Sequence, residues 1–196
     1  AAASLAQVHR ARVRDTGELI CLKIHYPGLS EVIDSDFDAV VRMLKVAHWL
    51  PSGRELEDWL QSMRQHLHNE IDYHREAELC LELQGHVASL DRSRIRLAVP
   101  GVYAEYCTDQ VLALEYIQGR TVAEDGLADL SLENRNELGR AMLELFFMEL
   151  FDWDVLQTDP NFGNYLVRTA ADGEELVLLD FGSVLRADQV FLHHLR

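Results

Sequence analysis

Three polar side chains in the last quarter of the sequence constrain the chain more than any other feature: Asp159, Asn164 and Asp180. Four residues separate Asp159 from Asn164, and Asp180 begins an Asp-Phe-Gly tripeptide directly after the apolar run 176–179. A short buried strand that ends in a carboxylate places it in a cleft, where carboxylate and amide oxygens can bind Mg²⁺. The spacing predicts that Asn164 and Asp180 hold a metal ion and that Asp159 orients an acceptor hydroxyl or takes its proton.

Lysine is rare in this chain, which contains only Lys23 and Lys45. Lys45 falls at the end of an expected helix, where a solvated cation is favourable. Lys23 lies in an expected strand between apolar neighbours, so if it points inward it needs an anionic partner. Phosphates and an acidic side chain both meet that need. On a regular helix Glu70 and Glu76 would be about 120° apart, so we favour Glu76 as the partner and keep Glu70 as the alternative.

The apolar periodicity and the turn signals predict strands and helices in a definite order. Residues 132–151 form a helix with Ser131 as its N-cap, and we expect Phe146, Phe147, Met148 and Trp153 to lie in the core. The other expected elements are a hairpin of 7–13 and 19–26, a helix over 31–50, one or two helices within 55–90, a strand pair of 102–107 and 111–117, and a hairpin of 165–168 and 176–179. This order is typical of an α+β, protein-kinase-like fold.

Composition excludes several classes of function. The net charge of −15 disfavours a nucleic-acid partner, because phosphate backbones require a basic surface. No apolar run is long enough to span a membrane. The three cysteines lack a Cys-x-x-Cys spacing, which argues against a zinc site and suits a reducing compartment. The chain starts without Met and stops soon after Asp-Phe-Gly, so we expect it to be part of a longer protein with a truncated C-terminal lobe.

The loop before the first expected strand departs from the usual phosphate-binding pattern. It has no glycine-rich motif and reads Ala1-Ala2-Ala3-Ser4, followed by Gln7-Val8-His9. This loop resembles the alanine-rich loop of the UbiB family of atypical kinases. Further segments similar to that family are Lys23–Gly28, Glu70–Ala77, Gln157–Asn164 and Asp180–Gly182, and together they span nearly the whole chain.

The resemblance implies a two-lobed fold that binds ATP with Mg²⁺, with an N-lobe over 1–118 and a partial C-lobe over 119–196. Ala1, Ala2, Ala3 and Ser4 would cover the phosphates, and Lys23 and Glu76 would form the ion pair. The other implied roles are Asp159 as catalytic acid/base, Asn164 and Asp180 as metal ligands, Glu115 and Ile117 as backbone contacts to adenine, and Glu70 with Asp72 as the family's Glu-x-Asp element.

The resemblance also implies a role in ubiquinone biosynthesis, through ATP hydrolysis or phosphorylation of a small, lipid-like acceptor rather than of proteins. The implied partners are quinone-precursor lipids and membrane-associated biosynthetic enzymes. The implied location is cytoplasmic or on the matrix side of a mitochondrial membrane, peripheral to it. One alternative is a nucleotide-gated scaffold for such enzymes with little catalysis. Another is a small-molecule kinase of the aminoglycoside phosphotransferase type, which the alanine-rich loop does not suit.

Overall fold

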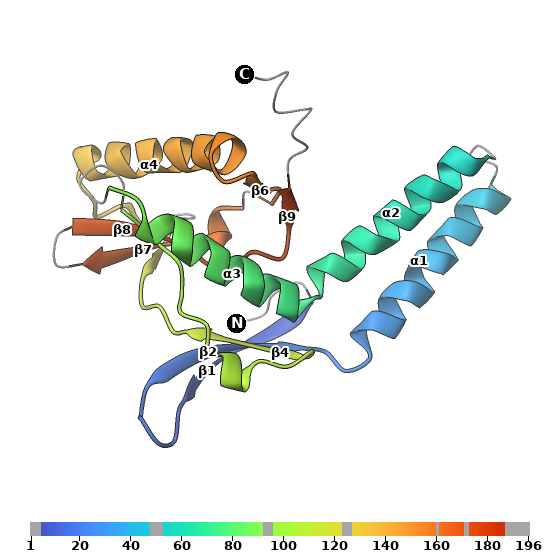
Figure 1. Ribbon diagram of the computed structural model, residues 1–196, viewed down its shortest axis with the longest axis horizontal. Helices are drawn as coiled ribbons and strands as arrows, with labels where there is room; N and C mark the ends of the chain where they lie inside the picture. The colour runs from blue at the N-terminus through green and yellow to red at the C-terminus, as the bar shows by residue number, and fades with distance from the viewer. Residues whose placement is uncertain are drawn as a thin grey trace.

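The computed structural model describes residues 5–47, 53–91, 96–122, 127–159, 161–170 and 173–186. The predicted phosphate-covering residues Ala1 to Ser4 lie outside these ranges. In the described residues two larger sheets lie on opposite sides of a central helix, α3, and a helical hairpin projects from one end of the molecule (Figure 1). The mixture of helices with mainly antiparallel strands is the predicted α+β class.

The first sheet has three strands in the order β1-β2-β4. Strands β1 (Ala6–Arg12) and β2 (Leu19–His25) form the predicted hairpin, and Gly17 in its turn adopts φ 76°, which glycine tolerates without steric cost. Strand β4 (Val111–Glu115) pairs with the other edge of β2. Lys23 therefore lies in the central strand, opposite Val8 on one side and Leu112 on the other.

The strand predicted over 102–107 is wrong. The segment makes only an isolated bridge from Val102 to Leu114 and then turns into a short 3₁₀ helix, η1 (Ala104–Tyr106). The backbone N–H of Ala113 points at Cys107 Sγ, 3.4 Å away, instead of at a carbonyl oxygen. A side chain thus takes the place of a ladder partner, and the segment bends away from β4.

Two long helices follow the first hairpin and lie side by side. Helices α1 (Leu29–Val46) and α2 (Arg54–Glu70) are antiparallel and extend away from both sheets (Figure 1). Their facing sides are joined by Arg64, which binds Asp34 at 2.7 Å, contacts Asp38, and lies over the ring of Phe37. No residue of α1 is buried, so the pair is held mainly by its own contacts.

Helix α3 (Tyr73–Ala88) begins only two residues after α2 ends, so the region 55–90 contains two helices. Asp72 causes the separation, because its backbone is extended and its carboxylate accepts a hydrogen bond from the N–H of Arg75 at 3.0 Å. The inward face of α3 is buried against the first sheet and β3, through Leu79, Cys80, Leu83 and Val87.

The second sheet has the order β3-β8-β7-β5. Strands β7 (Tyr165–Ala170) and β8 (Gly173–Leu178) form the predicted hairpin. The sequence patterns did not reveal the short edge strands β3 (Leu97–Ala98) and β5 (Arg120–Thr121), or the two-stranded sheet of β6 (Val155–Gln157) and β9 (Val184–Arg186). Segments of two or three residues are too short to show a period of two.

Helix α4 (Leu132–Phe151) packs against β6 and β8 and has the predicted bounds. Ser131 caps it by accepting the N–H of Asn134 at 3.1 Å. Trp153 is buried as expected, but Phe146 and Phe147 are about half exposed, so placing them in the core was wrong. Their rings contact each other, and Phe147 stacks on Phe151, instead of packing into the core.

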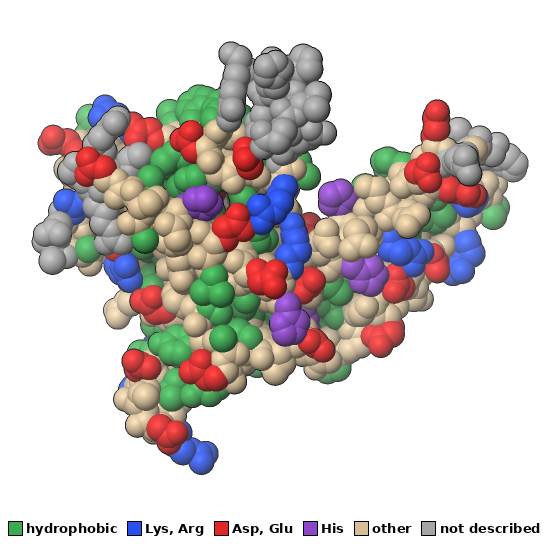
Figure 2. Space-filling view, viewed as in Figure 1, with side chains coloured by type: hydrophobic (Ala, Val, Ile, Leu, Met, Phe, Trp, Pro, Cys, Tyr) green, Lys and Arg blue, Asp and Glu red, His purple; other side chains and the backbone are tan. Residues whose placement is uncertain are grey.

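The surface is acidic without a basic patch on the face shown in Figure 2, where lysine and arginine are interspersed with acidic residues. None of the helices in the described ranges is both long and apolar enough to cross a bilayer. The hydrophobic core lies between α3, α4 and the sheets, around the fully buried residues Leu83, Leu97, Leu112 and Leu176.

We expect that adding a single methyl group in the connection between β4 and β5 destabilises the protein. A Cβ on Gly119 would lie 2.9 Å from the carbonyl oxygen of Val167 and 3.2 Å from Leu166 Cβ. Gly119→Ala should therefore lower the free energy of unfolding by about 1–3 kcal/mol, measured by urea denaturation. The control is Gly139→Ala, on the exposed side of α4 with open space around it, which should stabilise the protein by about 0.5–1 kcal/mol. Equal stability of the two variants would contradict the close approach.

Candidate functional site

Lys23 forms an ion pair with Glu76 across the space between β2 and α3. The distance from Lys23 Nζ to Glu76 Oε1 is 2.5 Å, and the two side chains are 14% and 4% exposed. The break at Asp72 explains why Glu76 is the partner. Glu76 lies in the first turn of the new helix α3, whereas Glu70 ends the preceding helix α2. Lys23 thus pairs with Glu76, the partner favoured by the sequence, and not with Glu70.

The two charges depend on one another because both are buried. Burial alone would lower the pKa of Lys23, but Glu76 and Asp180 outweigh it and the pKa is raised. Burial raises the pKa of Glu76, and Asp180 adds to this, while Lys23 and the N–H of Phe181 oppose it. Lys23 and the N–H of Phe181 are therefore the two groups that favour the charged form of this carboxyl.

Asp180 is the third member of this cluster. Its Oδ1 lies 3.5 Å from Lys23 Nζ and accepts a hydrogen bond from the N–H of Gly182 at 3.0 Å. The next residue, Phe181, is buried in the core, which fixes the turn, whereas the Asp180 side chain remains 40% exposed. Strand β8 thus delivers a carboxylate to an accessible position beside a buried cation.

Asp159 and Asn164 face one another in the loop before β7. Asn164 Nδ2 donates to the backbone oxygen of Asp159 at 3.2 Å and approaches its Oδ2 at 3.4 Å. This arrangement directs the amide nitrogen at Asp159 and leaves the amide oxygen as the atom that can bind a cation. The backbone N–H of Leu179 donates to the carbonyl of Asn164, so the loop is tied to the strand that carries Asp180.

All five of these side chains line one cleft, with a volume of about 180 Å³. The predicted residues that meet there are Lys23, Glu76, Asp159, Asn164 and Asp180. Sequence reasoning missed other lining residues, including His25, which stacks on Tyr73 with 3.7 Å between ring centroids. Both of those residues stand in motifs that the resemblance covers, Lys23–Gly28 and Glu70–Ala77, and that was the only signal for them.

Glu70 and Asp72 have different positions relative to the cleft. Glu70 lines it and accepts a hydrogen bond from Ser183 Oγ at 3.3 Å. Asp72 does not line it and serves instead as the N-cap of α3. The Glu-x-Asp element therefore joins the start of α3 to the segment after Asp180.

A set of donors holds the backbone between Asp180 and Val184. Gln157 Nε2 donates to the carbonyl of Asp180 at 2.7 Å, and Arg75 donates to the carbonyls of Gly182 and Val184 at 3.3 and 2.8 Å. Thr158 donates to the carbonyl of Ser183 through both its N–H and its hydroxyl. Arg75 comes from α3, so one helix orders both Lys23 and this segment.

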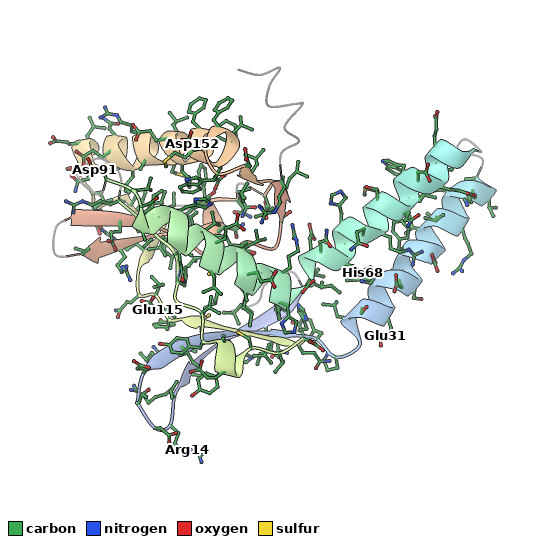
Figure 3. The ribbon with its side chains drawn as sticks, in the orientation of Figure 1. Arg14, Glu31, His68, Asp91, Glu115 and Asp152 are labelled. Carbon is green, nitrogen blue, oxygen red and sulfur yellow. The ribbon has the colours of Figure 1, made fainter. Side chains whose placement is uncertain are left out.

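Glu115 and Ile117, the predicted adenine contacts, do not line the cleft with Lys23. They lie where the chain passes from the first sheet to the second; Figure 3 labels Glu115 there. The Glu115 carboxylate accepts hydrogen bonds from the N–H of Gly101 and from Arg168. Ile117 is buried against Val177 and borders a separate open hollow of about 480 Å³.

The donor set fits a magnesium ion shared with a phosphate group better than a fully protein-bound metal. In the described ranges no group of three or more His, Cys, Asp or Glu side chains is arranged to hold a metal. Mg²⁺ is usually bound by one or two carboxylates together with waters and substrate phosphates. Asp180 and Asn164, beside a lysine that can meet the phosphates, supply such a partial set.

The comparisons with known proteins agree with this geometry. The model of the ABC1 atypical kinase-like domain matches residues 1–196. The chain belongs to this family of atypical kinases. Mitochondrial atypical kinase COQ8B of Rattus norvegicus is 37% identical over 194 residues, which is 99% of this chain, and atypical kinase COQ8 of Schizosaccharomyces pombe is 34% identical over 192 residues, or 98% of it. These matches confirm the UbiB-family membership predicted from the sequence.

This ABC1-family chain corresponds to only part of its relatives. It spans 35% of the length of the rat protein and 30% of the fission yeast protein. Among solved structures, one described as the complex of Rv3197 with erythromycin from Mycobacterium tuberculosis has a TM-score of 0.72 and 28% sequence identity. The likeness covers 95% of this chain and 45% of that one, and it supports the kinase-like fold.

We expect the ion pair to control stability in a pH-dependent way. Lys23→Met leaves the buried Glu76 carboxyl without its cation, so at pH 8 the free energy of unfolding should fall by about 3 kcal/mol. The pKa of an unpaired Glu76 is raised further in the folded state, so the loss should grow as pH rises through that pKa and shrink at acidic pH. Denaturant titrations at several pH values measure it.

Two variants serve as controls for this experiment. Lys45→Met removes the other lysine, which is exposed at the end of α1, and should change stability little at any pH. Lys23→Met combined with Glu76→Gln removes both charges and should recover most of the loss at pH 8. A pH-independent loss in Lys23→Met would show that Glu76 is not held ionised by Lys23.

Proposed function

We propose that this chain is the nucleotide-binding part of an ATP- and Mg²⁺-dependent atypical kinase or ATPase that supports ubiquinone biosynthesis. In this proposal residues 1–118 form an N-lobe and residues 119–196 part of a C-lobe. The observation that carries the proposal is the position of Asp180, whose carboxylate lies 3.5 Å from the amine of Lys23 while Glu76 holds that amine at 2.5 Å. A phosphoryl-transfer site needs a fixed cation next to a metal ligand, and this cluster fits that need.

Each residue has a distinct task in the proposed reaction. Lys23, held by Glu76, binds the α- and β-phosphates, and Asn164 and Asp180 are the metal ligands. Mg²⁺, when bound, supplies positive charge to the phosphate oxygens. Asp159 orients the attacking hydroxyl or water and accepts its proton. Its carboxylate is exposed beside Asn164, so an acceptor can reach it.

The remaining nucleotide contacts are assigned to residues outside the set that lines the cleft. Ala1, Ala2, Ala3 and Ser4 precede β1 in the sequence, with Leu5 between, and we propose that they cover the phosphates. Backbone groups of Glu115 and Ile117 would bind adenine, at the passage between the two sheets. Ile117 borders the open hollow of about 480 Å³ together with Tyr116, and apolar groups at such a hollow suit a flat aromatic base.

The biological setting is proposed from the relatives. The rat and fission yeast proteins are named mitochondrial atypical kinases, and their likeness supports a mitochondrial setting, in which we place the chain peripheral to the membrane. The acceptor would be water or a small lipid-like molecule, and the partners would be quinone-precursor lipids and membrane-associated biosynthetic enzymes. The acidic surface and the absence of a basic patch in the view of Figure 2 give no support to a nucleic-acid partner.

We expect nucleotide binding and turnover to separate in single variants. ATP with Mg²⁺ should raise the melting temperature of the protein, because a ligand of the folded state stabilises it. Lys23→Ala and Asp180→Asn should abolish that rise. Asp159→Asn should keep the rise and reduce ATP turnover by about 10²- to 10⁴-fold, the usual range for a lost acid/base group.

The matched control is Asp109→Asn, which changes an exposed carboxylate bound to His74 outside the cleft and should match the wild type in both assays. If Asp159→Asn kept full turnover, the catalytic assignment would fail. If wild-type protein bound the nucleotide but showed no turnover, a nucleotide-gated scaffold would replace the kinase proposal.

A further inference from the structure

A buried carboxyl group behind the cleft has no role in the reaction described above. Glu149 lies near the end of α4, one turn before Asp152, which Figure 3 labels. It is 5% exposed and sits on the same inward face as Leu145 and Leu138. Burial raises the pKa of Glu149 to about 7. An apolar residue at this position would favour folding more, because burying a carboxyl group opposes folding unless the group gains a hydrogen-bond partner.

The partner of Glu149 is the backbone of Gln157. Glu149 Oε2 accepts a hydrogen bond from the Gln157 N–H at 3.2 Å. Gln157 is the last residue of β6 and stands two residues before Asp159. Glu149 therefore fixes the main chain at the point where it enters the loop of the proposed active site.

The side chain of Gln157 continues the connection into the cleft. Its Nε2 donates to the carbonyl oxygen of Asp180 at 2.7 Å. Its Oε1 is buried and has no hydrogen-bond partner in the ranges that the structure describes. The single strong contact of this side chain is therefore the one with Asp180, and its direction depends on where the backbone of Gln157 is held.

The space between these groups is nearly closed. Glu149, Gln157, Asn164 and Asp180 line one small cavity of about 10 Å³, which has room for no more than a single water. In so dense a region a shift of one group displaces its neighbours. The carboxyl of Glu149 thus stands behind both proposed metal ligands without reaching the cleft, because it does not line the larger space in front of them.

We propose that Glu149 is a positioning residue for the metal ligand Asp180 and that it acts through Gln157. The inference rests on the proposed function, because Asp180 is a metal ligand only if the site binds Mg²⁺. Groups that hold metal ligands in place typically alter metal affinity by 10- to 100-fold when they are removed. The hydrogen-bond relay itself does not depend on the nature of the ligand.

The first test compares two substitutions of similar size at Glu149. Glu149→Met fills the space but offers no acceptor to the Gln157 N–H, whereas Glu149→Gln keeps an acceptor oxygen. The readout is the Mg²⁺ concentration that gives half of the ATP-dependent thermal shift. We expect Glu149→Met to raise it about tenfold or more, and Glu149→Gln to remain close to the wild type.

A control on the same helix separates positioning from stability. Leu145→Ala removes a buried apolar side chain one turn away from Glu149 and should cost about 2–5 kcal/mol of stability. Its half-effective Mg²⁺ concentration should nevertheless match the wild type. If Leu145→Ala and Glu149→Met weakened Mg²⁺ binding in proportion to their loss of stability, the positioning role would be refuted.

A double-mutant cycle tests whether Gln157 transmits the effect. Gln157→Leu removes the donor to the Asp180 carbonyl and leaves the backbone N–H in place. If one relay carries the effect, Glu149→Met combined with Gln157→Leu should weaken Mg²⁺ binding no more than the stronger single change does. Additive effects of the two substitutions would overturn the proposal.

Hydrogen exchange measured without ligand tests the role of Glu149 separately from the proposed function. The N–H groups of Phe181 and Gly182 are bonded to Glu76 and Asp180, so their hydrogen exchange reports on the Asp180 segment. Glu149→Met should speed their exchange relative to the core of β8, and unchanged exchange would reject the relay. If the wild type failed to bind ATP with Mg²⁺, the proposed function would fail while this readout still decided whether Glu149 orders Asp180.

Discussion

The ion pair between Lys23 and Glu76 is the contact on which the rest of the site depends. It joins the central strand of one sheet to the helix between the sheets, and neither charge could remain buried without the other. The same carboxylate also accepts the N–H of Phe181, so the position of Asp180 is tied to that of Lys23. One interaction therefore connects the phosphate-binding side of the cleft with its metal-binding side.

Helix α3 is the structural element that makes this connection possible. Asp72 starts the helix, Arg75 binds the carbonyls of Gly182 and Val184, and Glu76 binds Lys23. Three functions thus fall within five consecutive residues. Because successive residues of a helix point in different directions, α3 can serve a strand and a loop at once.

Much of the site could be predicted from the sequence because its motifs are short and have strict spacings. The two lysines differ in their surroundings, which made Lys23 the candidate for phosphate binding, but its inward direction followed only from the other motifs and the resemblance. The choice between Glu70 and Glu76 was settled by the break at Asp72. Periodicity alone had allowed either one helix or two in this region. Gln157, Arg75 and Glu149 were missed as supporting residues, because their partners lie 8 to 109 positions away in the chain. Gln157 and Arg75 stand in motifs that the resemblance covers, whereas nothing local indicates Glu149. The elements with clear periodicity were predicted correctly. The strand predicted over 102–107 was wrong, because there Cys107 Sγ accepts the N–H of Ala113 in place of a backbone carbonyl.

The helical hairpin of α1 and α2 has a mechanical consequence. Helix α2 has 17 residues, so it is about 25 Å long, and it is attached to α3 through only Ile71 and Asp72. A force applied to its far end acts on that short junction with the advantage of a lever arm. A displacement of about 4 Å at the tip corresponds to a rotation of only about 10° at the junction, given that length. Glu76 lies one helical turn beyond the junction, so a small force at the tip of the hairpin acts with a long lever arm on the helix that carries the ion pair.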